Sequence, residues 1–194
     1  MRESNTITSV AYALEKEGIT AFRIDFARNG ESEDTLQYGN YHREADDLHS
    51  VILGHSKGGN VVLLYASKYH DVHRLIDVSG HYKTEGGVEE HLGKGYLQKV
   101  KKDGEILYRV TEESLMDRLD TNMQEACLQI DKDCKVLTVH ESDDSVVQVE
   151  EALGFANVIP NHKLQIIKGA DHRFSEHRDD LASIGMSFIK TLNR

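Results

Sequence analysis

The chain has 194 residues, of which 39% are hydrophobic and 29% are charged, and its formal net charge is −10. A chain of this length buries the core of one domain, and no repeat or long linker divides it, so we expect a single domain over residues 1–194. The acidic excess repels polyanions, which argues against nucleic acid and an anionic membrane surface as partners.

The apolar runs are short, and residues 1–5 do not resemble the start of a signal peptide. The only two cysteines, Cys127 and Cys134, stand outside any metal-binding spacing. Two free thiols fit a reducing compartment. We therefore expect a cytoplasmic protein without a disulfide.

Hydrophobic periodicity and turn-forming residues predict helices and strands that alternate along the first part of the chain. Apolar residues from Ile7 to Leu14 recur at helical spacing, with Ser4 or Asn5 as N-cap and Gly18 as the stop. The segments that follow are a strand at 19–26, a turn at 27–32, a helix near 41–48, a strand at 51–53, a helix at 61–66 and a strand at 75–78.

Residues 80–131 interrupt this alternation with polar, glycine-containing segments and short helices near 112–119 and 123–130. We expect a helical, cap-like insertion at about 81–131, lying over the edge where the strands end. The alternation then resumes with a strand at 136–140, a helix at 149–157, a strand at 164–167 and a helix at 181–189. This order predicts an α/β fold with a mostly parallel, doubly wound sheet.

The sequence Gly54-His55-Ser56-Lys57-Gly58-Gly59 places a serine between two glycines, after a predicted strand and before a predicted helix. A G-x-S-x-G motif in that context is a nucleophile elbow. We expect Ser56 on a sharp, strained turn, with Gly54 and Gly58 allowing the strand and the helix to pass close together. A glycine-rich turn without chemistry is the alternative, which the flanking strand and helix disfavour.

A serine hydroxyl is a weak nucleophile unless an imidazole takes its proton and a carboxylate orients that imidazole. Candidate acids, Asp143 and Asp144, follow one predicted strand, and His172 follows the next. Because parallel strands present their carboxyl ends at one edge, these residues are expected to meet Ser56 there. The alternatives are a solvated loop histidine and two acids that only cap a turn.

Together these motifs resemble the α/β-hydrolase superfamily, and more narrowly a plant branch of small esterase-like or serine-aminopeptidase-like hydrolases related to cinnamoyl and feruloyl esterases. The resemblance covers nearly the whole chain. The matching stretches are Asp25-Phe26 with Asn29-Gly30-Glu31-Ser32, Gly54–Gly59, His140-x-Ser142-x-Asp144 and Gly169-Ala170-Asp171-His172.

The resemblance implies that Ser56 is the nucleophile and that His172 is the general base and then the general acid. It implies Asp144 as the orienting carboxylate, with Asp143 as the alternate. It also implies that the backbone N–H of Lys57 is one oxyanion donor, and that no cofactor is required. His55, inside the elbow, is expected to pack or to form hydrogen bonds rather than to act as a second base.

Members of this family normally carry strands before the helix at Ile7, and a loop after one of them gives the second oxyanion donor. This sequence shows no counterpart of that portion, so we expect activity reduced by about 10²–10³-fold. A shortened sheet also predicts an exposed edge and homo-oligomers. Only His49 and Ser50 connect the helix near 41–48 to the elbow strand, and Glu141 stands where the family usually has glycine.

Two functions follow from these patterns. The first is a serine hydrolase that acts on a small carboxylic ester or related acyl substrate through an acyl-enzyme at Ser56. The alternative is a non-catalytic or weakly active shortened α/β-hydrolase-fold protein that binds a small ligand or a partner. His70 and His73 have a metal-like spacing but lack further ligands at a familiar interval, so we expect no metal.

Overall fold

A computed structural model of the chain describes residues 5–21, 23, 51–84, 96–100, 106–111, 116 and 118–191. The elements are α1 (Asn5–Lys16), β1 (Val51–His55), α3 (Lys57–Tyr69), β2 (Arg74–Val78), β3 (Tyr96–Val100), β4 (Ile106–Thr111), α5 (Met123–Leu128), β5 (Lys135–Glu141), α6 (Val149–Val158), β6 (His162–Ile167) and α7 (Arg178–Lys190). The helix expected near 41–48 and the connection at 49–50 lie outside these residues.

Four of the strands form one parallel sheet in the order β1-β2-β5-β6. The register pairs Leu53 with Ile76, and Ile76 with Leu137. Because all four strands run in the same direction, their carboxyl ends lie at one edge, where β1 ends at His55 and β5 at Glu141. The expected parallel, doubly wound sheet is confirmed.

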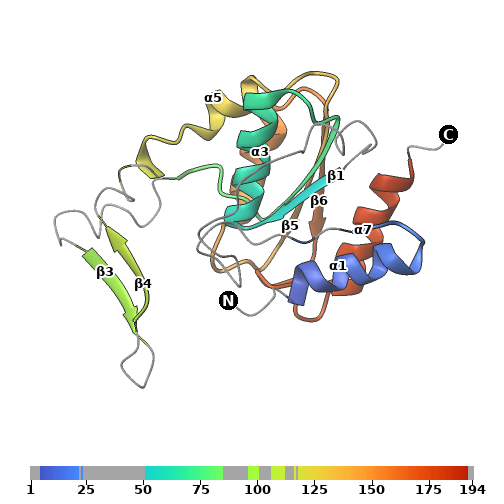
Figure 1. Cartoon of the computed structure of the whole chain (residues 1–194), viewed down its shortest axis with the longest axis horizontal. Coiled ribbons are helices and arrows are strands. Elements are labelled where there is room, and N and C mark those ends of the chain that lie inside the picture. The colour runs from blue at the N-terminus through green and yellow to red at the C-terminus, as the bar shows by residue number, and fades with distance from the viewer. Residues whose placement is uncertain are drawn as a thin grey trace, which may run out of the picture.

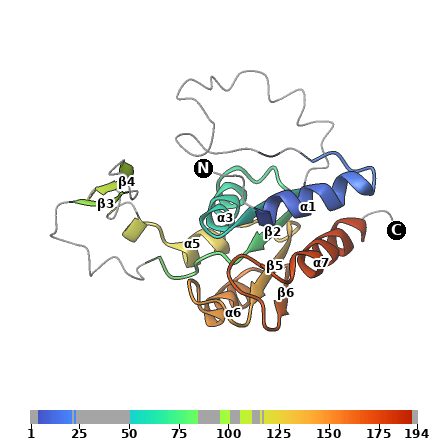
Figure 2. The same cartoon turned by 90° about the horizontal axis from the view of Figure 1, so that it is seen from below.

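Helices cover both faces of this sheet: α3, α5 and α6 lie on one side, and α1 and α7 on the other (Figures 1 and 2). Successive strand residues point to opposite faces, so Leu75 packs in the core under α3 while Ile76 packs in the core under α7. Both side chains are fully buried. Two continuous cores therefore hold the sheet edge in place from both sides.

The insertion differs from the helical expectation. Residues 123–130 do contain a helix, α5, but β3 and β4 form an antiparallel hairpin that was not expected. In both views this hairpin lies to the side of the four-stranded sheet (Figures 1 and 2). The sequence held the signal, because two β-rich segments flank Asp103-Gly104, a pair that favours tight hairpin turns.

The strand expected at 19–26 is not present in its described part. Residues 19–21 and 23 have no strand pairing, and the remainder lies outside the described residues. Helix α1 ends as expected before Gly18, which adopts a φ of 74° in the left-handed region that glycine favours. Among the residues that the structure describes, no helix is both long enough and apolar enough to cross a membrane.

The glycines of the elbow do not share the role that the sequence predicted. A Cβ on Gly54 would lie 2.0 Å from the carbonyl oxygen of Gly58, so the β1–α3 crossing requires glycine there. A Cβ on Gly58 would meet nothing within 4 Å. The second tight glycine is Gly59, whose Cβ would lie 2.1 Å from Oδ1 of Asp77. Gly54 and Gly59, rather than Gly54 and Gly58, allow the close approach.

We expect Gly54→Ala to destabilise the fold by about 3 kcal/mol, because the added methyl group collides with backbone atoms that cannot rotate away. Gly58→Ala is the matched control and should change the free energy of unfolding by less than about 1 kcal/mol, since it adds a methyl group to open space in the first turn of α3. Urea unfolding of both variants checks this, and equal losses would contradict it.

Candidate active site

Ser56 lies at the turn between β1 and α3, with φ 56° and ψ −124°. A non-glycine residue at positive φ is strained and persists only where the surroundings enforce it. Here the Ser56 N–H donates to the carbonyl of Val78 on β2 at 2.7 Å. Ser56 is also the N-cap residue of α3, but its side chain forms no capping hydrogen bond. Its hydroxyl is therefore left for another partner.

That partner is His172, in the loop after β6. Gly169 turns the chain there with a φ of 77°, and Asp171 accepts hydrogen bonds from the N–H and the hydroxyl of Ser175, both at 2.8 Å. The hydroxyl of Thr6, in α1, donates to the Arg173 carbonyl at 2.9 Å. The loop is thus held both by its own turn and by the first helix.

The structure brings Ser56, His172 and Asp144 together in a chain of hydrogen bonds. His172 Nε2 lies 3.1 Å from Ser56 Oγ, and His172 Nδ1 lies 2.7 Å from Asp144 Oδ2. Asp143, the alternate acid, is exposed and accepts a hydrogen bond from the Ser142 hydroxyl instead. Geometry therefore selects Asp144 as the acid that orients His172.

Asp144 is held in its ionised form. Burial alone raises the pKa of its carboxyl, but hydrogen bonds from His172 and from the N–H groups of Val147 and Val146 outweigh burial, and the net pKa is lowered. The two N–H groups donate to Oδ1 at 2.9 and 2.7 Å, so Oδ2 is left for the imidazole. An anion beside Nδ1 stabilises the imidazolium that forms when His172 accepts a proton.

His140, the last residue but one of β5, fixes the loop that carries Asp144. Its ring is fully buried, and its Nε2–H donates to the Val147 carbonyl at 3.0 Å. Burial lowers the pKa of His140, which keeps the ring neutral at neutral pH. Because Val147 also donates its N–H to Asp144, His140 is connected to Asp144 through one shared residue.

His55 packs against His172 from the β1 side. The ring centroids of His55 and His172 lie 5.0 Å apart, and His55 Nε2–H donates to the His172 carbonyl at 2.8 Å. Burial lowers the pKa of His55 to about 4, so the ring is neutral. Its role is a hydrogen-bonding one, and the sequence pattern gave the same expectation.

Lys57, the expected oxyanion donor, is the first residue of α3. The first N–H groups of a helix lack partners within it and carry partial positive charge, which suits a developing anion. Asn60, one turn later, forms two hydrogen bonds with the backbone of His81: its side-chain amide donates to the carbonyl at 2.6 Å and accepts from the N–H at 2.9 Å. This pair holds the segment after β2 against α3.

Two buried acids near the triad were missed by the sequence reasoning. Glu141, fully buried at the end of β5, lies with its carboxyl oxygens 2.7 and 2.6 Å from the hydroxyl of Ser79. Asp77, fully buried in β2, accepts a hydrogen bond from the Thr138 hydroxyl at 3.1 Å. An acidic residue within the apolar strand 75–78 was the available signal for Asp77, and an acid at a position where the family has glycine was the signal for Glu141.

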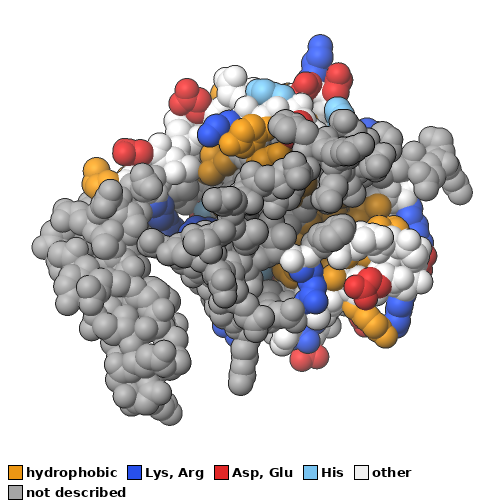
Figure 3. Space-filling view, viewed as in Figure 1, with side chains coloured by type: hydrophobic (Ala, Val, Ile, Leu, Met, Phe, Trp, Pro, Cys, Tyr) orange, Lys and Arg blue, Asp and Glu red, His pale blue; other side chains and the backbone are white. Residues whose placement is uncertain are grey.

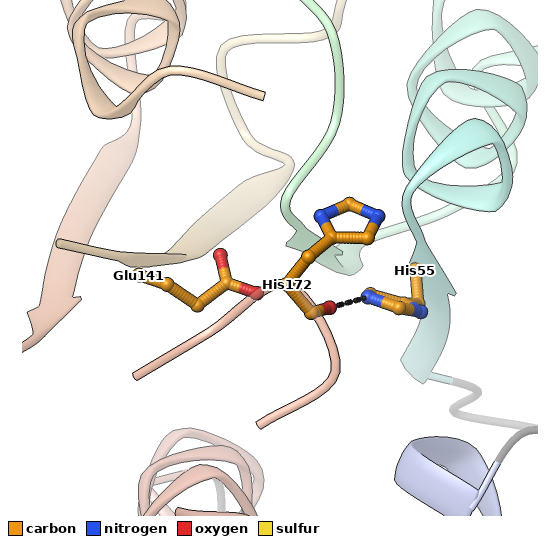
Figure 4. A group of neighbouring side chains, drawn as sticks. All are labelled: His55, Glu141 and His172. Atoms are coloured by element: carbon orange, nitrogen blue, oxygen red, sulfur yellow. Dashed lines mark hydrogen bonds between the residues drawn. The ribbon is translucent and has the colours of Figure 1, made fainter. Parts of the chain in front are cut away.

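His55, Glu141 and His172 carry donor atoms that lie within 4.8 Å of one another, a spacing that a metal ion could use. Figure 4 shows, however, that their side chains do not converge on one point, because the His172 backbone lies between Glu141 and His55. Each group also has a partner already: Ser79 for Glu141, the His172 carbonyl for His55, and Asp144 for His172. We assign no metal to this group.

The sequence matches no protein-family model, and no curated protein sequence matches it. Solved structures are similar. Est1E from Butyrivibrio proteoclasticus, solved with ferulic acid, has a TM-score of 0.74 at 20% identity and covers 97% of this chain and 83% of its own. The esterase domain of a Rhodothermus marinus protein has a TM-score of 0.66 at 18% identity, over 97% of this chain and 80% of its own.

The α/β hydrolase GrgF from Penicillium sp. sh18 has a TM-score of 0.60 at 18% identity, over 73% of this chain and 63% of its own. At such identities the likeness concerns the fold, and it agrees with the parallel sheet and the strand–serine–helix turn described above. The chain has the α/β-hydrolase fold.

We expect acid to destabilise the protein through His55. Its pKa is about 4 in the folded state against 6.5 as a free group, so the unfolded chain binds more protons as pH falls from about 6.5 to 4, and stability is lost across that range. The loss from His55 alone is about 3 kcal/mol at pH 4.

His55→Gln keeps an amide N–H for the His172 carbonyl but does not titrate. Urea unfolding at pH 7 and pH 4 should therefore show a smaller acid loss in the variant than in the wild type. An equal loss in both proteins would show that His55 is not the neutral group described here.

Proposed function

We propose that the chain is a serine hydrolase that cleaves a small carboxylic ester, or a related acyl substrate, through an acyl-enzyme at Ser56. The observation that carries the proposal is the hydrogen-bonded chain from Ser56 through His172 to Asp144. These residue types in this order are the groups that acyl transfer requires: a nucleophile, a base and an acid that orients the base.

The chemistry follows from the two ends of the His172 ring. As Ser56 Oγ attacks the substrate carbonyl carbon, its proton passes to His172 Nε2, and the ionised Asp144 stabilises the resulting imidazolium at Nδ1. The imidazolium then gives its proton to the leaving alcohol, and the C–O bond of the ester breaks. Water, deprotonated by His172, attacks the acyl carbon; the bond from this carbon to Ser56 Oγ then breaks, and His172 returns the proton to Oγ, which releases the carboxylic acid and restores Ser56.

The negative charge on the carbonyl oxygen develops next to the N-terminus of α3. In this proposal the N–H of Lys57 donates to that oxygen, and the partial positive charge of the helix end adds to the stabilisation. The side chain of Lys57 points to solvent and has no part in the step.

Two observations support a small neutral ester as the substrate class. The similar solved structures include an esterase with ferulic acid bound and a second esterase domain. On the face drawn in Figure 3, acidic and basic side chains of the described residues are interspersed rather than gathered into one basic area that would suit a polyanion. The proposed substrate is therefore a small ester rather than a charged polymer.

A fluorophosphonate probe tests the nucleophile directly, because it forms a covalent bond only with an activated serine. We expect labelling of the wild-type protein at Ser56, with loss of labelling in Ser56→Ala. Hydrolysis of p-nitrophenyl acetate and butyrate, followed by absorbance, should be lost in the same variant. A folded wild-type protein that is neither labelled nor active would instead favour the alternative, a protein of this fold that binds a ligand without turnover.

The neighbouring acids Asp144 and Asp143 offer a matched pair of substitutions. Asp144→Asn should lower kcat by about 10²–10⁴-fold, because the amide neither stabilises the imidazolium nor keeps the tautomer of His172. Asp143→Asn removes an exposed carboxylate whose one side-chain hydrogen bond within the described residues is with Ser142, and it should change kcat less than about threefold. Steady-state rates on a p-nitrophenyl ester compare them, and the reverse order would place the acid at Asp143.

A further inference from the structure

Glu141 is a fully buried carboxyl group directly behind the triad, and the mechanism proposed above does not use it. Its neighbourhood is set by three strand ends. Ser79 follows β2, His55 ends β1, and the loop after β6 brings His172. The donor atoms of Glu141, His55 and His172 lie within 4.8 Å of one another (Figure 4).

The surroundings of the carboxyl group favour its neutral form. Ser79 Oγ lies 2.7 Å from one carboxyl oxygen of Glu141 and 2.6 Å from the other, so a single hydroxyl, with one hydrogen to donate, faces both oxygens. In the described part of the chain, no lysine or arginine forms an ion pair with Glu141. A fully buried carboxylate with one side-chain donor and no cation beside it is costly to ionise.

Electrostatics favour the same form. The charged or titratable groups that face Glu141 are Asp144 in the loop after β5, Asp171 and His172 after β6, His55 at the end of β1, and His140, whose Nε2 lies 4.0 Å from the carboxyl. The pKa of Glu141 is raised to about 8, because burial, together with the negative charges of Asp144 and Asp171, outweighs the hydrogen bonds from the Ser79 hydroxyl and the backbone, which lower it.

We propose that Glu141 is a neutral positioning residue whose ionisation sets the alkaline limit of the site. While it is protonated, Asp144 is the only anion that His172 contacts among the described residues. This inference rests on the serine-hydrolase function proposed above. A neutral Glu141 leaves the Nδ1–H of His172 with one acceptor, which keeps Nε2 in line with Ser56 Oγ.

Ionisation changes this arrangement. The Ser79 hydroxyl can still donate to the carboxylate, but the buried anion also attracts the imidazole N–H groups around it, among them those of His140 and His172. It thereby competes with Asp144 for the His172 imidazole. This competition turns His172 away from Ser56 and lowers kcat/KM on the alkaline side.

The same titration must appear in stability, where no substrate is involved. The folded-state pKa is about 8 against 4.5 for the free group, so this group's contribution to stability is fully present below pH 4.5 and is lost as pH rises through about 8. Glu141→Gln keeps the shape and a hydrogen-bond donor but does not titrate. The melting temperature of Glu141→Gln should therefore rise relative to that of the wild type as pH increases.

The experiment compares wild type, Glu141→Gln and the control Glu150→Gln, which removes an exposed carboxylate on α6. We expect kcat/KM of the wild type and of the control to fall with a midpoint near pH 8, and this alkaline limb to be absent from Glu141→Gln. The midpoint of the acid limb should stay within about 0.3 pH unit in all three proteins. If Glu141 were an anion in the wild type, its replacement by glutamine would move the midpoint of the acid limb by about 1 pH unit or more.

Melting temperatures at pH 5, 7 and 9 form the second arm. The difference between Glu141→Gln and wild type should grow by about 5 °C or more from pH 5 to pH 9, while the control shows no such trend. A constant difference together with an unchanged alkaline limb overturns the proposal. If the wild type hydrolyses no ester, the function proposed above fails, and the melting series alone then decides whether Glu141 is a neutral acid.

Ser79→Ala distinguishes an effect on the pKa of Glu141 from a loss of packing. The Ser79 hydroxyl lowers the pKa of Glu141, so its removal should move the alkaline limb to higher pH. A purely structural role for the pair would change the rate at all pH values alike and would leave the midpoint in place. A midpoint that stays near pH 8 in Ser79→Ala contradicts the assignment.

Discussion

The rest of the site depends on the crossing of β1 and α3 at Gly54. The missing side chain there lets the carbonyl of Gly58 come so close that the chain must reverse within Ser56 itself, at positive φ. The cost of that strain is offset by the Ser56 N–H bond to Val78 and by two apolar cores that fix β1 between helices on both faces. A serine held in this way presents its hydroxyl at the sheet edge, where β5 and β6 also end.

Burial keeps most of the titratable groups at this sheet edge in their neutral forms. Around His172 the structure gathers His55, His140, Glu141 and Asp144, yet the direction of each pKa shift leaves only Asp144 charged at neutral pH. Asp144 differs because two backbone N–H groups and the imidazole donate to it, whereas Glu141 has only the Ser79 hydroxyl. Deeper burial of Glu141 and the larger number of donors to Asp144 together separate the neutral acid from the ionised one.

Much of this could be predicted from the sequence because it is local. The elbow, the strands that precede Asp144 and His172, and the order of the three residues are all patterns within short windows, and the strand bounds differ by only a few residues from those observed. The roles of Gly58 and Gly59, and the Glu141–Ser79 pair, could not be predicted in this way. The glycine roles depend on how closely α3 approaches β1 and Asp77 of β2. The Glu141–Ser79 pair depends on the register between β2 and β5, and periodicity along one strand carries no register.

That register produces two acid–hydroxyl pairs between β2 and β5. In one pair the acid lies on β2, and in the other it lies on β5. Asp77 of β2 pairs with Thr138 of β5, and Glu141 of β5 pairs with Ser79 after β2. Burial raises the pKa of Asp77 to about 7 and that of Glu141 to about 8, so near neutral pH Glu141 is mostly protonated and Asp77 is about half protonated. Strands β2 and β5 lie between β1, which carries Ser56, and β6, which leads to His172. The spacing of Ser56 and His172 is therefore set across β2 and β5, and the two acid–hydroxyl pairs connect these strands by side-chain hydrogen bonds in addition to the backbone pairing.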